Sequence, residues 1–316
     1  MHESLTVLSA VVPVLGIIVI GLVIRKLDWL TEEADHSLLR VNINLLFPCL
    51  ILDKALGNAA LSNMGNLLLA PTVGFTTVAV GFAIAWFCAR FSGLTEPKAR
   101  RTFAISVGLY NYGYIPLPLS LMLFTGTETA GVLFVHNVGV ELAMWTLGVM
   151  IFTGAGVGQS WRKFINAPLI AILISLLLNA LGAADHLPKA LLHGIGWLGQ
   201  CAIPMSLILI GAVVADHLKE AHADWGWRVI AGASVLRLGL LPIGFLILAK
   251  YLPVSVELKR VIVLEAAMPA AVFPIVMSRH YGGDPATALR VVIGTSVIGM
   301  VTIPFWIRFG MKFVGL

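Results

Sequence analysis

Long apolar runs alternate with short polar segments along the whole chain. Each run has about 20 residues, the length that an α-helix needs to cross the hydrocarbon core of a bilayer. The polar segments are too short to form a soluble domain. The pattern predicts an all-α membrane protein with ten transmembrane helices, over residues 5–24, 38–57, 67–89, 101–124, 130–153, 166–183, 189–215, 227–249, 259–280 and 287–309.

The composition supports this class. Hydrophobic residues make up 59% of the chain and charged residues 12%. One soluble core could not hide so much apolar surface, whereas a lipid bilayer covers it. The net charge of +5 comes from Lys and Arg in loops beside the apolar runs, as is typical of membrane topology. We therefore expect a bilayer and no nucleic acid as partner, and no cofactor beyond a coupling ion.

Lys and Arg are unevenly shared between the two sides of the predicted bilayer. Most of them, among them Arg25, Lys26, Arg100 and Arg101, lie on the side opposite the termini. Basic loops tend to stay in the cytoplasm. The distribution predicts a multi-pass protein of the inner or plasma membrane with both termini outside the cytoplasm.

The two halves of the chain carry related features. An offset of 156 residues aligns segment 46–52 with segment 202–208, and the same offset aligns Pro118 with Pro274. One such match would be weak, but a shared offset indicates an internal repeat.

The repeat divides the chain into residues 1–153 and residues 165–316. Each half contains five predicted spans, and an odd number makes the second half enter the membrane from the opposite side. Inverted repeats of this kind are a common plan of secondary transporters. We therefore expect two inverted five-helix repeats.

The fourth predicted span contains Gly108, Gly113, Pro116 and Pro118 near its centre. Proline removes a backbone donor and clashes with the preceding turn, and glycine adds backbone freedom. The alternative is an ordinary proline kink, but the ninth span carries a matching disturbance.

That ninth span contains Pro269 and Pro274. Unpaired backbone groups are tolerated at membrane depth only inside protein or beside a wet cavity. Matched breaks favour two discontinuous helices that meet near the midplane. Their half-helix N-termini would present N–H groups and positive dipole ends to a carboxylate.

Several motifs together resemble the auxin efflux carrier family, which includes bacterial organic-acid permeases and plant PIN carriers. They are Asn111-x-Gly-x-x-Pro-x-Pro118, Met268-Pro-Ala-Ala-Val-Phe-Pro274, Tyr281-Gly-Gly-Asp-Pro285, Arg237-Leu-Gly-Leu-Leu-Pro242 and Trp145-Thr-Leu-Gly148.

The resemblance implies the inverted fold of bile-acid sodium symporters, with spans 4 and 9 broken and crossing. It also implies a mobile transport domain of spans 3–5 and 8–10, and a scaffold of spans 1, 2, 6 and 7 that forms a homodimer. The substrates of the family are small organic anions, chiefly carboxylates.

The residues predicted to bind substrate lie at the breaks and along the fifth span. They are Asn111, Tyr112, Gly113, Pro116, Pro118, Asn137, Glu141, Pro269, Phe273 and Pro274. Asn111 matches a substrate-contact position of the family, and its alternative role is to cap a helix end. Asn137 could instead bind a neighbouring helix.

Glu141, Glu265 and His136 are the predicted coupling residues, because ionisable groups within a span tend to be functional. Glu141 replaces the amide usual in the family, and its charge would repel an anion unless it is protonated. Glu265 matches the region of an acidic sodium ligand in the related symporters, so it is a possible sodium ligand; the alternative is a buried pair with Arg237. His136 could simply be a hydrogen-bonded histidine of the bundle.

Together these features predict secondary active transport of small organic anions, mainly efflux, by alternating access driven by protons, sodium or the membrane potential. The alternative is a sodium-coupled importer of amphipathic anions of bile-acid type, and an anion channel is a different class. The sequence contains neither HExxH metal spacing nor a nucleophile elbow, so we do not expect an enzyme.

Overall fold

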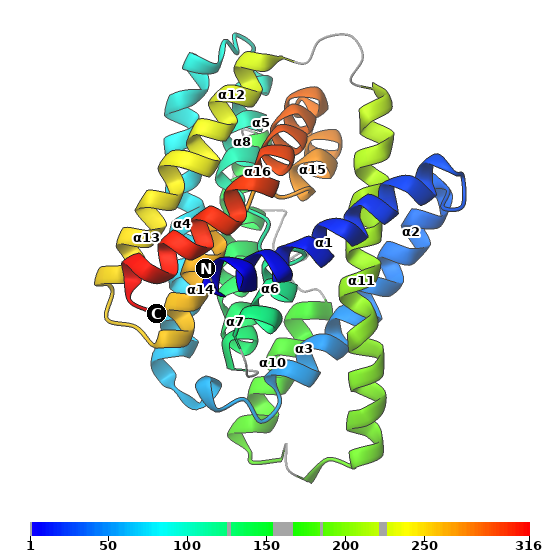
Figure 1. Ribbon diagram of the computed structural model, residues 1–316, viewed down its shortest axis with the longest axis vertical. Coiled ribbons are helices and arrows are strands. Elements are labelled where there is room, and N and C mark those ends of the chain that lie inside the picture. The colour runs from blue at the N-terminus through cyan, green and yellow to red at the C-terminus, as the bar shows by residue number, and fades with distance from the viewer. Residues whose placement is uncertain (1, 125–127, 154–166, 184–185, 221–225) are drawn as a thin grey trace.

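The computed structural model describes residues 2–124, 128–153, 167–183, 186–220 and 226–316, and these ranges are almost entirely helical (Figure 1). In chain order the α-helices are α1 (His2–Lys26), α2 (Glu32–Val41), α3 (Phe47–Ala55), α4 (Met64–Cys88), α5 (Pro97–Gly108), α6 (Pro116–Leu123), α7 (Glu128–Ala143), α8 (Val149–Thr153), α10 (Ala167–Ala180), α11 (Lys189–Glu220), α12 (Trp227–Val235), α13 (Leu241–Tyr251), α14 (Val256–Ala267), α15 (Phe273–Tyr281) and α16 (Pro285–Val314).

Short π-helical segments join three pairs of these helices into longer rods. Asn42–Leu46 joins α2 to α3, Met144–Gly148 joins α7 to α8, and Leu236–Leu240 joins α12 to α13. The extra residue in each wide turn shifts the helix face without ending the helix. Spans therefore continue through these points.

Five rods are long and apolar enough to cross a membrane, which confirms the all-α membrane class. They are Met64–Ser92, Glu128–Thr153, Lys189–Asp216, Trp227–Tyr251 and Pro285–Val314, and they correspond to predicted spans 3, 5, 7, 8 and 10. The helix α10 is apolar but shorter. The count of ten and the inverted relation of the halves stay predictions, and the expected boundary at residues 154–164 lies outside the described residues.

Two of the predicted spans are interrupted. Within residues 101–124, α5 ends at Gly108 and α6 begins at Pro116. Within residues 259–280, α14 ends at Ala267 and α15 begins at Phe273. Proline stands in the first turn of both second segments, where its missing N–H costs nothing. The predicted breaks in these two segments are thus present in the structure.

Glycines bring two helix pairs into close contact. Where α1 crosses α11, a Cβ on Gly211 would lie 2.0 Å from the carbonyl oxygen of Ile18. Where α4 packs on α7, a Cβ on Gly139 would lie 1.8 Å from the carbonyl oxygen of Pro71. Small residues let membrane helices approach at backbone distance. The α4–α7 contact fixes the part of α7 that carries the predicted site residues.

We expect Gly139→Ala to lower the thermal unfolding midpoint of the purified protein in detergent. The added methyl group must push α4 from α7, and overpacking of this kind costs about 1–3 kcal/mol. The matched control is Gly244→Ala, because Gly244 lies on an exposed face of α13 and a Cβ added there would have no atom within 4 Å. Equal midpoints for the two variants would contradict the close contact.

Candidate functional site

The two interruptions meet and pair through their main chains. The Asn111 N–H donates to the Pro269 carbonyl at 2.8 Å, and the Ala271 N–H donates to the Leu109 carbonyl at 2.9 Å. These two hydrogen bonds form one antiparallel bridge between the segments. The bridge satisfies backbone groups that the broken helices leave unpaired at membrane depth.

The C-terminal end of α14 is capped by a buried arginine from the π-helical segment of α12–α13. The Arg237 Nε donates to the Met268 carbonyl at 3.0 Å, and its Nη2 lies 3.1 and 3.3 Å from the carbonyls of Glu265 and Ala266. A cation at this position also opposes the negative end of the helix dipole. Arg237 thus stabilises the break itself.

This cap differs from the pairing considered from the sequence. The Arg237 guanidinium contacts the main chain of Glu265, and no ion pair with the Glu265 carboxylate occurs among the described residues. The guanidinium also lies over the rings of Tyr110 and Phe245, 5.2 and 5.3 Å from their centroids. These contacts tie α12–α13 to both interrupted segments.

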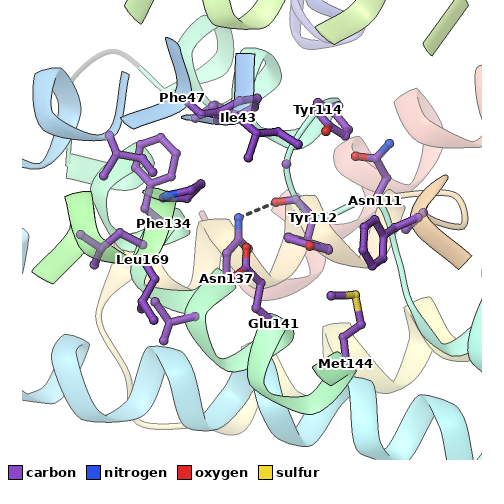
Figure 2. Close-up of a pocket in the computed structure, with 18 of the residues that line it drawn as sticks. Ile43, Phe47, Asn111, Tyr112, Tyr114, Phe134, Asn137, Glu141, Met144 and Leu169 are labelled. Carbon is purple, nitrogen blue, oxygen red and sulfur yellow. Dashed lines mark hydrogen bonds between the residues drawn. The ribbon is translucent and has the colours of Figure 1, made fainter. Parts of the chain in front are cut away.

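A cavity of about 260 Å³ opens beside the crossing (Figure 2). One side is formed by the segment before α6, by the start of α15 and by α7; the other side is formed by the α2–α3 rod and by α10. The lining residues are Ile43, Phe47, Ile51, Asn111, Tyr112, Gly113, Tyr114, Leu117, Phe134, Asn137, Val138, Glu141, Met144, Trp145, Pro168, Leu169, Ile172, Ala271, Val272 and Phe273.

Six of the residues predicted to bind substrate come together in this lining: Asn111, Tyr112, Gly113, Asn137, Glu141 and Phe273. The four prolines do not line the cavity. Pro116 and Pro118 lie in the first turn of α6, Pro274 lies in the first turn of α15, and Pro269 accepts a hydrogen bond of the bridge. The prolines shape the breaks, and substrate contact by any of these residues stays a prediction.

Both asparagines hold the unwound segment in place. The Asn111 Oδ1 accepts from the Ile115 N–H at 3.3 Å, next to the start of α6. The Asn137 Nδ2 donates to the Tyr112 carbonyl at 2.6 Å, the bond drawn in Figure 2. Asn137 thus binds the unwound segment itself, whereas the sequence suggested a bond to a neighbouring helix, and both side chains also line the cavity.

Glu141 lies one helical turn after Asn137, and both side chains project from α7 into the cavity (Figure 2). Trp145 lies a further turn along and also lines the cavity. Its ring meets Phe273 edge to face, with centroids 5.5 Å apart. This face of α7 thus presents an amide, an acid and an aromatic ring in register.

His136 and Glu265 lie outside the cavity lining and are fully buried. The His136 Nδ1 lies 3.3 Å from the Asn137 Oδ1, whereas its Nε2 has no hydrogen-bond partner within the described ranges. Neither carboxylate oxygen of Glu265 has a hydrogen-bond partner there. Buried polar atoms usually have hydrogen-bond partners, and the coupling role of Glu265 stays a prediction.

The main-chain carbonyls of Glu265, Ala266 and Met268 near this side chain accept hydrogen bonds from Arg237. A sodium site at Glu265 stays a prediction.

Sequence reasoning missed the apolar side of the cavity. Phe47, Ile51, Leu169 and Ile172 lie in apolar runs, and their side chains do not differ in kind from the many other apolar residues of these runs. Trp145 could have been found, because it follows Asn137 and Glu141 at a spacing of four residues, which places all three on one helix face.

We expect Arg237→Met to lower the free energy of unfolding by about 2 kcal/mol or more, because the carbonyls of Ala266 and Met268 lose their donor and each such buried carbonyl costs about 1–3 kcal/mol. The measurement is thermal or denaturant unfolding of the purified protein. The matched control is Arg90→Met, since exposed Arg90 donates to one carbonyl, that of Phe87. Equal stability of the two variants would show that Arg237 does not support the break.

The chain also resembles known sequences over nearly its whole length. It is 26% identical to an uncharacterized transporter of Methanothermobacter thermautotrophicus over 310 residues, which cover 97% of this chain and 98% of the relative. It is 22% identical to an uncharacterized transporter of Methanocaldococcus jannaschii over 307 residues, 95% of this chain and 97% of the relative.

A family described as membrane transport protein matches the chain in two segments, residues 6–160 and residues 157–307. The two matches together span almost all of the sequence, including both interruptions and the cavity. The chain therefore belongs to the membrane transport protein family, the family of the auxin efflux carriers.

Proposed function

We propose that this protein is a secondary active transporter of small organic carboxylates that works by alternating access, with efflux as the expected direction. The observation that carries the proposal is the antiparallel bridge between the two interrupted segments beside a cavity. Such a crossing would bring two half-helix N-termini to one site, where their positive dipole ends favour a carboxylate.

The walls of the cavity support a moving-unit mechanism. The polar wall belongs to α5–α6, α7 and α15, which are parts of the proposed transport domain. The apolar wall belongs to the α2–α3 rod and α10, which are parts of the proposed scaffold. A substrate at the boundary between two units becomes accessible to either side when one unit moves against the other.

The topology is part of the proposal. It comprises ten spans in two inverted five-helix repeats, with both termini outside the cytoplasm of the cell membrane. The two family matches, residues 6–160 and 157–307, divide the chain near the expected midpoint and support a repeat. A homodimer through the scaffold completes the arrangement. Membership of a transporter family favours transport over catalysis.

Cavity size favours small substrates over the bile-acid alternative. Sites for drug-sized ligands measure about 300–1,000 Å³, and this cavity has about 260 Å³. A large amphipathic anion would need a wider site than this conformation offers. An anion channel, the different class, would conduct without exchanging one substrate molecule for another.

We expect purified protein in liposomes loaded with unlabelled carboxylates to accumulate an external labelled carboxylate transiently, because a carrier exchanges substrate through one site. The measurement is tracer counterflow with a panel of small mono- and dicarboxylates. Asn137→Ala should slow it about tenfold or more, since this change frees the Tyr112 carbonyl and loosens the polar wall. Asn44→Ala is the matched control, because exposed Asn44 binds only the Arg40 carbonyl. Steady current without counterflow would indicate a channel instead.

Coupling is assigned first to Glu265, with His136 and Glu141 as the other candidates. We expect Glu265→Gln to abolish accumulation driven by a proton gradient while counterflow at equal pH continues, because glutamine keeps the shape but cannot exchange a proton. The control is Glu257→Gln in the first turn of α14, where this side chain is partly exposed. Sodium-driven accumulation in the parent protein, lost in Glu265→Gln, would contradict the proton assignment.

A further inference from the structure

The cavity carries a charge that a simple anion site would avoid. Among its described lining residues, Glu141 is the one with a side chain charged at neutral pH, and none is Lys, Arg or His. A second carboxylate a few ångströms away would be repelled, and weak local screening strengthens that repulsion. A substrate with a negative group alone therefore leaves Glu141 unexplained.

Aromatic rings line the same cavity as this acid. Phe47, Tyr112, Tyr114, Phe134, Trp145 and Phe273 line the cavity. Trp145 follows Glu141 by four residues, in the π-helical segment that continues α7, and its ring packs edge to face on Phe273. Aromatic faces attract cations, tryptophan most strongly, and the effect grows when water is excluded. An acid beside such rings is a recognisable environment for an ammonium group.

The same cavity also contains an environment suited to a negative group. Tyr112, Gly113 and Tyr114 lead into α6, while Ala271 and Val272 lead into α15, and all five line the cavity. These are the positive ends of two half-helices, which suit a carboxylate. The Asn137 bond to the Tyr112 carbonyl holds this segment next to Glu141 (Figure 2). One cavity thus offers environments for both charges.

We propose that the transported carboxylate also carries a protonated amine, so that the substrate is a small zwitterion such as an apolar or aromatic α-amino acid. This inference rests on the proposed function and names its substrate class. The ammonium group binds Glu141 beside Trp145, and the carboxylate binds at the starts of α6 and α15. The apolar side chain of the substrate packs against Phe47, Ile51 and Ile172 on the scaffold side.

Hydrogen bonds from the protein to Glu141 are compatible with this role. A carboxylate offers about four acceptor positions over its two oxygens, so it can bind an ammonium group together with other donors. The negative charge of Glu141 supplies the specificity, because a neutral amide at this position would bind amino and non-amino carboxylates alike.

The test compares pairs of compounds that differ in the amine alone. Phenylalanine is paired with 3-phenylpropionate, and leucine with 4-methylpentanoate. Thermal stabilisation and counterflow are measured for the full-length protein. We expect each amino acid to bind and exchange about tenfold or more better than its partner, because loss of one member of a buried charge pair leaves the other uncompensated.

The variant Glu141→Gln should remove this preference by weakening the amino acids while leaving the non-amino carboxylates equal or improved. Glu128→Gln is the matched control, since Glu128 is exposed at the start of the same helix and outside the cavity. Retention of the preference in Glu141→Gln would overturn the assignment of the ammonium site.

The outcomes separate this inference from the proposed function. Exchange of non-amino carboxylates with none of amino acids would overturn the zwitterion inference and leave carboxylate transport standing. Equal exchange of phenethylamine, which has no carboxylate, would keep the ammonium site and overturn the proposed carboxylate function. No binding of any compound by folded protein would overturn both.

Discussion

Backbone hydrogen bonding is the constraint on which the rest of this structure depends. Two helices stop in the middle of an apolar environment, and each stop exposes N–H and C=O groups that lipid cannot satisfy. The bridge between Asn111 and Pro269 and between Ala271 and Leu109 pairs some of them. Arg237 takes three more carbonyls, and the Thr295 Oγ1 accepts from the Ala270 N–H at 3.2 Å. The cavity exists because these partners make the breaks tolerable.

The helical class, the five long rods and both interruptions could be predicted from the sequence, because apolar run length and in-span prolines act locally. The partners of the breaks could not. Arg237 lies about 30 residues from the carbonyls that it caps, and its choice of main chain over the Glu265 carboxylate depends on tertiary packing. Thr295 could not be recognised in the sequence as a partner of the break, because a threonine that bonds its own helix is common in apolar spans.

The polar side of the candidate site could also be predicted from the sequence. Asn111, Asn137 and Glu141 stand out in apolar surroundings, and burying such groups is costly. The apolar wall, with Ile51 and Ile172, is indistinguishable in sequence from residues that face lipid. The division into a polar and an apolar wall matters for the proposed movement of the two units. In the proposed mechanism, directional contacts would hold the substrate to one unit, and the apolar wall, which makes no directional bonds, would let the other unit move past.

The arginine cap also shows how the interruption between α14 and α15 is held in place. The end of α14 is held by donors from its own chain and from another rod: the Glu265 carbonyl accepts from the Met268 N–H and from Arg237, and Arg237 also binds the carbonyls of Ala266 and Met268. The gap is therefore tied to a neighbouring rod as well as to its own chain. In the proposed transport cycle, the rods that share Arg237 would move together as one unit.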